Sequence, residues 1–103
     1  RALTARGYQV VEATDGEHAL EVARTHRGAI DLLVSDLVMP RIGGRELAQL
    51  IARDRPQVRT LFVSGYIEPE LVLNPDYLQK PFGTSELITR IREVLDATEA
   101  GSS

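Results

Sequence analysis

Three side chains of complementary chemistry stand where short β-prone stretches of this sequence end. Asp36, Ser64 and Lys80 supply a carboxylate, a hydroxyl and an ammonium group. Carboxylates act as phosphoryl acceptors by forming aspartyl phosphates, and lysine is a point charge that suits a phosphoryl oxygen. A serine hydroxyl can donate a hydrogen bond to the same group. Brought together, the three side chains would form a site for an anionic group, and phosphoryl chemistry suits them best.

Each residue also has a purely structural interpretation. Aspartate is common in turns, so Asp36 alone could cap a turn, and Ser64 alone could simply end a strand. Lys80 carries the most specific signal, because the following Pro81 biases its backbone toward an extended form. It is also the only lysine of the chain. The three residues together are therefore more informative than any one of them.

The elements that would position these side chains alternate between helix and strand. Residues 1–6 look like the end of a helix that Gly7 closes, and Thr84 is expected to be the N-cap of the last helix. The expected strands are Tyr8–Ala13, 32–35, 60–63 and Tyr77–Gln79. The other expected helices end near residue 25 and before residue 56, with one further turn within 68–73.

This alternation predicts an α/β fold with right-handed crossovers and a parallel sheet covered by helices. The run at residues 32–34 is continuously apolar, which is typical of a strand buried on both faces. The carboxyl ends of parallel strands meet at one edge of the sheet, where open α/β sheets bind ligands. We therefore expect Asp36, Ser64 and Lys80 to converge at that edge.

Composition limits the class of protein. The chain has 103 residues, 43% of them hydrophobic, which suits one domain at residues 1–96 and a flexible tail at residues 97–103. It contains no cysteine, and its net charge of -3 provides no basic footprint for nucleic acid. No apolar run is long enough to span a bilayer, and no signal peptide opens the chain. We expect a cytoplasmic domain that contacts neither nucleic acid nor membrane.

Four motifs follow one another over nearly the whole chain. They are G-Y-Q-V-V-E-A-T-D-G-E-H-A-L at 7–20, S-D-L-V-M-P at 35–40, S-G-Y at 64–66 and Y-L-Q-K-P-F at 77–82. Together they resemble the receiver (response regulator) domain of two-component signal transduction. The last two motifs are most similar to receivers attached to hybrid sensor histidine kinases. The resemblance implies a flavodoxin-like (CheY-like) three-layer α/β sandwich.

The resemblance also implies a function, that of a phosphoacceptor receiver in a two-component phosphorelay. Asp36 falls on the phosphoacceptor, which takes a phosphoryl group from a histidine of a kinase or phosphotransfer protein. Lys80 falls on the lysine that contacts the phosphate, Ser64 on the switch hydroxyl and Tyr77 on the aromatic switch. The family's Mg²⁺ would be held by Asp36 and the backbone carbonyl of Val38, together with an acidic pair. Such a domain is a signalling module and not an enzyme, although its parent protein could be a hybrid histidine kinase.

Two departures from the family pattern stand out. The family begins with a strand that ends in two acidic residues, and neither feature is present in this chain. Because the family's strand order is 2-1-3-4-5, the strands at Tyr8–Ala13 and 32–35 are expected to lack their shared neighbour. We therefore expect weak or no Mg²⁺ binding, and poor stability or a homodimer formed by strand pairing or exchange. The short span from Ser64 to Lys80 predicts a shortened fourth helix.

Two other functions compete with this hypothesis. Haloacid-dehalogenase-like phosphatases also place aspartate, serine or threonine, and lysine at strand ends. They need a second aspartate two residues after the nucleophile, and Val38 stands there. A pseudo-receiver that serves only as a protein-interaction module is the other alternative. The presence of Asp36, Ser64 and Lys80 argues against it, whereas the missing acidic pair supports it.

Overall fold

All four expected strands form, and a fifth strand joins them at the N-terminal end. The structure is a computed structural model that describes the backbone of residues 2–5 and 8–101 and the side chains of residues 8–96. In order across one sheet, the strands are β1 (Ala2–Ala5), β2 (Tyr8–Ala13), β3 (Leu32–Asp36), β4 (Arg59–Ser64) and β5 (Tyr77–Gln79). Strands β2 to β5 run parallel, and β1 pairs antiparallel with β2.

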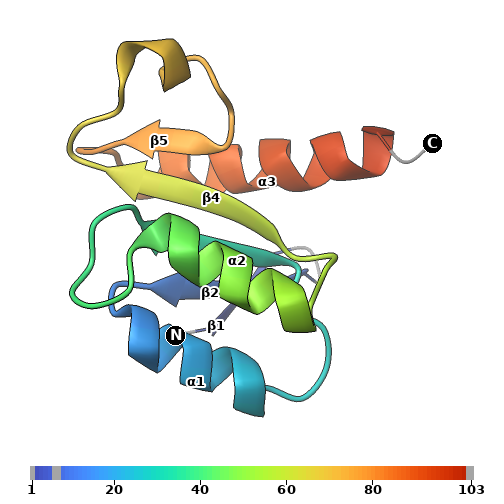
Figure 1. The fold of residues 1–103 in the computed structure, drawn as a ribbon. Coiled ribbons are helices and arrows are strands. Elements are labelled where there is room, and N and C mark those ends of the chain that lie inside the picture. Colours follow the sequence, from blue (N-terminus) through green and yellow to red (C-terminus); the bar gives the residue numbers. More distant parts are fainter. Residues whose placement is uncertain (1, 6–7, 102–103) are drawn as a thin grey trace.

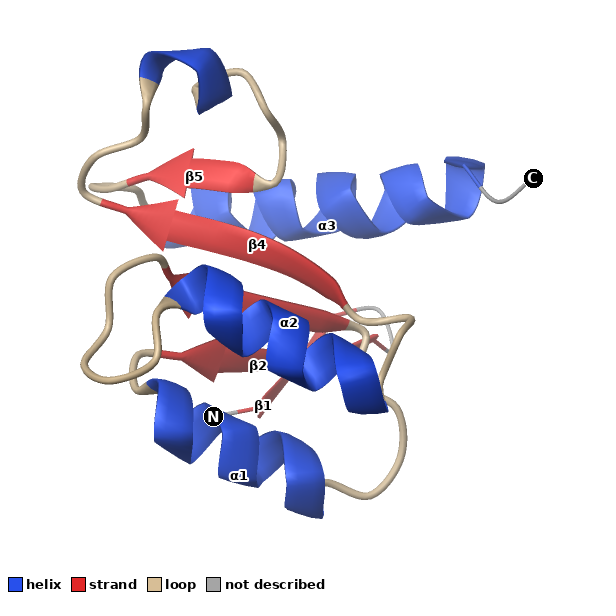
Figure 2. Ribbon diagram, in the orientation of Figure 1, coloured by secondary structure: helices blue, strands red, loops and turns tan. Residues whose placement is uncertain are grey.

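Helices cover both faces of this sheet. They are α1 (Gly16–Thr25), α2 (Gly44–Asp54) and α3 (Thr84–Gly101). Helices α1 and α2 lie over one face and α3 over the other (Figure 1). The expected three-layer α/β sandwich is therefore confirmed. Between β4 and β5 a short 3₁₀ turn, η1 (Pro69–Leu71), takes the place of a full helix, as predicted (Figure 2).

The sheet separates two hydrophobic clusters, because successive side chains of a strand point to opposite faces. Leu32 and Val34 pack with residues of α3, whereas Leu33 between them packs with residues of α1 and α2. Leu32 and Leu33 are 0% and 1% exposed. Each such leucine stabilises the fold by roughly 1.5–3 kcal/mol. Strand β3 is thus anchored on both faces, and it ends at Asp36.

The helix expected over residues 1–6 is not present in the described part of that segment. Ala2–Ala5 is instead a strand, with Ala2 opposite Val11 and Ala5 opposite Tyr8. Helix propensity is only a weak preference, and pairing with the edge of β2 satisfies the backbone N–H and C=O groups of both strands. Arg1, Arg6 and Gly7, which belong to the same expectation, lie outside the described residues.

The expected gap between the second and third strands is also absent. Strand β2 pairs directly with β3, with Val10 opposite Leu32 and Ala13 opposite Ser35. The expectation that these two strands lack a neighbour is wrong, because parallel pairing between them uses the groups that a central strand would have taken. Poor stability or a homodimer was predicted because the backbone groups of these two strands would be unpaired. The direct pairing of β2 with β3 removes that reason.

The C-terminal helix extends past residue 96, where the domain was expected to end. Helix α3 begins at Thr84, so this residue lies inside the helix rather than before it, and the helix continues to Gly101. The domain boundary expected at residue 96 thus falls inside this helix, and the flexibility expected of the segment 97–103 stays a prediction. This stretch contains Ala97, Glu99 and Ala100, and alanine and glutamate both favour helix.

Gly44 begins α2 directly against the strand end that carries Asp36. A Cβ on Gly44 would lie 2.3 Å from the Asp36 carbonyl oxygen, far inside van der Waals contact. We expect Gly44→Ala to lower the free energy of unfolding by about 1–3 kcal/mol, because the backbone must shift. Urea denaturation measures this, with Gly65→Ala as the control, since a Cβ there meets no described atom within 4 Å. Equal losses in the two variants would contradict the prediction.

Candidate functional site

Three parallel strands end at the same edge of the sheet, and Asp36, Ser64 and Lys80 lie at their ends. Strand β3 ends at Asp36, which lies opposite Val63 of β4. Strand β4 ends at Ser64, whose carbonyl accepts a hydrogen bond from the N–H of Lys80 at 2.8 Å. The structure therefore places the carboxylate, the hydroxyl and the ammonium group of these residues in one neighbourhood.

Asp36 and Lys80 form an ion pair. The distance from Lys80 Nζ to Asp36 Oδ1 is 2.7 Å, and the two side chains are 46% and 20% exposed respectively. An ammonium group at this distance offsets the charge of the carboxylate. It also holds the carboxylate in one orientation, with Oδ1 toward Lys80. Because both side chains remain accessible, the pair can exchange its contact for a contact with an incoming anion.

A small hollow lies beside this pair. Its volume is about 130 Å³, and it is lined by Asp36, Val38, Val63, Ser64, Gly65 and Lys80. The Ser64 hydroxyl oxygen accepts a hydrogen bond from the N–H of Tyr66 at 3.3 Å. That bond uses the oxygen as an acceptor and leaves the hydroxyl proton to donate. The hollow thus presents one carboxylate, one ammonium group and one hydroxyl to a small group that enters it.

Val38 lies at the rim of the hollow, in the loop that follows β3. Its side chain is 86% exposed. The loop is held at its base, where the N–H of Leu37 donates to the carbonyl of Val63 at 3.0 Å and the N–H of Gly44 donates to the carbonyl of Leu37 at 2.9 Å. An exposed valine here offers no side-chain acid or base, so only its backbone could take part in chemistry.

Tyr77 stands apart from the hollow. Its half-buried ring lies 5.3 Å from the ring of Phe62, and its hydroxyl accepts a hydrogen bond from Arg45 at 3.4 Å. The Arg45 guanidinium lies 5.8 Å from the centre of the Tyr77 ring. The bond to Tyr77 raises the pKa of Arg45 above its ordinary value. The sequence does not single out Arg45, because no residue pattern signals a contact between α2 and β5.

A comparison with protein families decides what kind of domain carries this site. Residues 1–92 match the model of the response regulator receiver domain. The chain belongs to this family. Receiver domains are signalling domains of two-component systems, so the resemblance seen in the motifs is confirmed.

Relatives of this receiver domain occur both inside kinases and as separate regulators. The sensor kinase CckA of Brucella abortus (strain 2308) is 38% identical over 102 residues, which cover 93% of this chain and 11% of the kinase. The receiver protein CpdR of the same organism is 32% identical over 105 residues, which cover 94% of this chain and 84% of CpdR. The chain therefore corresponds to one small part of the kinase and to most of CpdR.

The receiver fold is also seen in solved structures. The receiver domain of the hybrid histidine kinase CckA superposes with a TM-score of 0.67 at 37% identity, covering 87% of this chain and 79% of that one. A two-component transcriptional regulator from Clostridium phytofermentans superposes with a TM-score of 0.68 at 29% identity, covering 87% of this chain and 71% of that one. The predicted similarity to receivers of hybrid kinases is thus confirmed. None of the described helices is long and apolar enough to cross a membrane.

Receiver domains generally bind Mg²⁺ at an acidic pocket. In the described part of this receiver, no group of three or more histidine, cysteine, aspartate or glutamate side chains could hold a metal ion. Asp36 contributes one carboxylate, already paired with Lys80, and Val38 can contribute a backbone carbonyl. Glu12 lines a neighbouring hollow of about 180 Å³ with Asp36 and Lys80. Mg²⁺ is usually held through one or two carboxylates with phosphate oxygens and waters, and Asp36 and Glu12 are the carboxylates that line these two hollows.

Proposed function

We propose that this receiver domain accepts a phosphoryl group on Asp36 from a phosphorylated histidine of a partner kinase or phosphotransfer protein. The observation that carries the proposal is the 2.7 Å contact between Lys80 Nζ and Asp36 Oδ1 beside a hollow that Ser64 also lines. A carboxylate with an adjacent cation and hydroxyl has the groups needed to receive a phosphoryl group and to hold it.

The transfer proceeds by direct displacement at phosphorus. Lys80 pairs with Oδ1 of Asp36, so the attack is assigned to Oδ2. A bond forms between this oxygen and phosphorus, the bond from phosphorus to the histidine nitrogen breaks, and the imidazole leaves with the electron pair and takes up a proton. The Lys80 ammonium group and the Ser64 hydroxyl then stabilise the negative charge on the phosphoryl oxygens.

The domain acts as a signalling module in this proposal, not as an enzyme. A haloacid-dehalogenase-like phosphatase would need an acid or base two residues after Asp36, and the exposed Val38 side chain supplies neither. One specific observation favours the alternative of a non-phosphorylated interaction module: among the described residues, no group of three or more histidine, cysteine, aspartate or glutamate side chains could hold a metal ion. A cytoplasmic location remains a prediction.

The test is transfer from a phosphorylated histidine protein to the full-length protein that contains this domain. We expect the mass of the receiver to increase by one phosphoryl group, and we expect hydroxylamine to remove it, because an acyl phosphate is cleaved by this nucleophile. A phosphoryl group that resists hydroxylamine would be an ester on a hydroxyl residue and would overturn the assignment to Asp36. No transfer under any donor would favour the interaction module.

Tyr77 is expected to change position when Asp36 is phosphorylated. The phosphoryl oxygens carry about -1.5 to -2 units of charge, which replace the single negative charge of the Asp36 carboxylate, and the Ser64 hydroxyl is expected to turn toward them. Tyr77 should then leave Arg45 and reorient, in a shift between two populated states. The ring signals of Tyr77 in NMR spectra, recorded before and after phosphorylation, measure this. Tyr8, which begins β2 at the end of the strand away from the hollow, is the control ring. Unchanged Tyr77 signals would show that the ring is not coupled to the site.

A further inference from the structure

Arg41 has an unusual backbone conformation in the loop between Asp36 and α2. Its φ angle is 67°, in the left-handed region that residues other than glycine rarely adopt. The N–H of Ile42 donates to the carbonyl of Pro40 at 2.7 Å, which closes a three-residue turn centred on Arg41. Turns of this form are rare and strained, and they persist only where their surroundings hold them.

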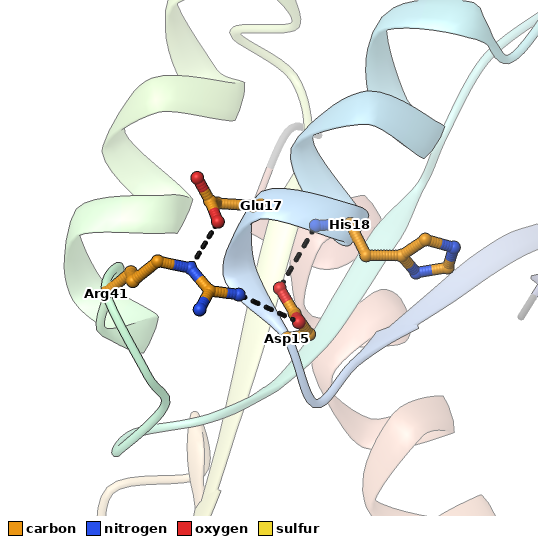
Figure 3. Close-up of polar contacts among 4 residues, drawn as sticks. All are labelled: Asp15, Glu17, His18 and Arg41. Atoms are coloured by element: carbon orange, nitrogen blue, oxygen red, sulfur yellow. Dashed lines mark hydrogen bonds and ion pairs between the residues drawn. The ribbon is translucent and has the colours of Figure 1, made fainter.

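The side chain of Arg41 helps to stabilise this turn. Its guanidinium lies between two carboxylates at the start of α1, paired with Asp15 through Nη2 and Oδ2 at 3.4 Å and with Glu17 through Nε and Oε1 (Figure 3). Asp15 also caps α1, because its other oxygen accepts the N–H of His18 at 3.2 Å. Exposed ion pairs are individually weak, but here two of them share one guanidinium.

The backbone of the loop rests on α1 at the same place. A Cβ on Gly16 would lie 2.7 Å from the Cβ of Ile42, so only glycine permits this approach. Ile42 follows Arg41 directly, and Gly16 lies between the two carboxylates that Arg41 binds. The ion pairs and the backbone contact therefore hold the middle of the loop against one end of one helix.

The ends of the same loop meet at the phosphoacceptor. Gly44 lies so close to the Asp36 carbonyl that a side chain there would clash, and its N–H donates to the carbonyl of Leu37. Val38, between these anchors, lines the hollow beside Asp36. A movement in the middle of the loop therefore changes both the rim of the hollow and the backbone that carries the acceptor.

We propose that Arg41 is a positioning residue that clamps this loop against Asp15 and Glu17 and so fixes Asp36 and Val38 for phosphoryl transfer. The inference rests on the proposed function of Asp36 as acceptor. Arg41 does not touch the hollow, so it acts through the loop and not on the phosphoryl group. Reacting groups that are misplaced by about 1 Å can lose on the order of 10²-fold in rate, so a loosened loop is expected to slow the transfer.

Arg41→Gly separates this role from a merely structural one. Glycine adopts a positive φ without strain, so the variant relieves the backbone while it removes both ion pairs. We expect the unfolding midpoint to change little, because these two effects oppose each other, and the rate of phosphoryl labelling to fall roughly tenfold. Arg41→Lys keeps a cation between Asp15 and Glu17 and should retain much of the rate. Arg24→Ala, at the other end of α1, is the control and should not alter it.

Amide hydrogen exchange over residues 37–43 gives a readout that does not depend on phosphorylation. We expect exchange in this loop to be faster in Arg41→Gly than in the unmodified protein, and unchanged in Arg24→Ala. If the unmodified protein is labelled and Arg41→Gly is labelled equally fast, the positioning role is overturned while the acceptor role stands. If the unmodified protein is never labelled, the proposed function fails, and unchanged exchange in Arg41→Gly would then overturn the clamp as well.

Discussion

Asp36→Asn is expected to abolish phosphoryl labelling of the full-length protein. An amide is neither a nucleophile toward phosphorus nor a charged partner for Lys80, so both features of the acceptor are lost in one change. The two side chains have nearly the same shape, and Lys80 is sufficiently exposed to remain hydrated without its partner. The variant should therefore fold, which circular dichroism and thermal unfolding would verify, and its labelling should fall below detection in intact-mass measurements.

A matched variant controls for the loss of a carboxylate elsewhere in the sheet. Asp76 precedes β5, and its Oδ1 lies 3.7 Å from Nη2 of Arg59 in a partly exposed ion pair. Asp76→Asn removes a comparable pair away from the hollow and should leave labelling unchanged. Undiminished labelling of Asp36→Asn would show that another residue accepts the phosphoryl group. Equal losses in both variants would indicate a general effect on folding.

The second large effect concerns Mg²⁺. The charges of Asp36 and Lys80 sum to zero, and Mg²⁺ sheds its water reluctantly, so the 103-residue chain is expected to bind the ion weakly and to be labelled poorly. A chain extended upstream by a strand that ends in two acidic residues should bind Mg²⁺ more than about tenfold more tightly. A unit charge at about 4 Å contributes on the order of 4 kcal/mol at an effective dielectric constant of 20.

The two chains should be compared side by side. Titration with Mg²⁺, followed by NMR of the Asp36 and Val38 amides, gives the affinity without any need for phosphorylation. Labelling with a small phosphodonor then shows whether the rate follows the affinity, as expected if the metal neutralises phosphoryl oxygens during transfer. Equal affinity and equal labelling in the two chains would show that the acidic pair is dispensable here.

Local residue patterns were sufficient to predict most of the elements and the core of the site. The continuous apolar run that includes Leu33 is typical of a strand buried on both faces, and a strand ending there places Asp36 at the carboxyl edge of the sheet. The contact between Asp36 and Lys80 follows from topology alone, since parallel strands end together. The roles assigned to these residues remain proposals, because position does not establish reactivity.

Other features depend on the whole fold, so the sequence could not reveal them. Ala2–Ala5 contains two alanines and a leucine, which favour helix, yet its conformation is set by the partner strand beside it. The direct pairing of β2 with β3 depends on which strands are present to compete. The contacts of Arg41 and Arg45 arise between segments far apart in the chain, and the contact of Arg41 also needs a positive φ that favours glycine. An arginine at a position of this kind carries no signal in a sequence read alone.

The order of the sheet has a consequence for how quickly the chain can fold. Every strand pairs with the strand next to it in the sequence, from β1 to β5. Each pairing needs only one connecting segment to close, and the entropic cost of closing a segment grows with its length. In the 2-1-3-4-5 strand order of flavodoxin-like folds, by contrast, the second strand forms an edge of the sheet, and the third strand pairs with the first strand instead of the second. The present order has the lower relative contact order of the two, and proteins with low contact order fold faster. The sheet can therefore grow one strand at a time along the chain.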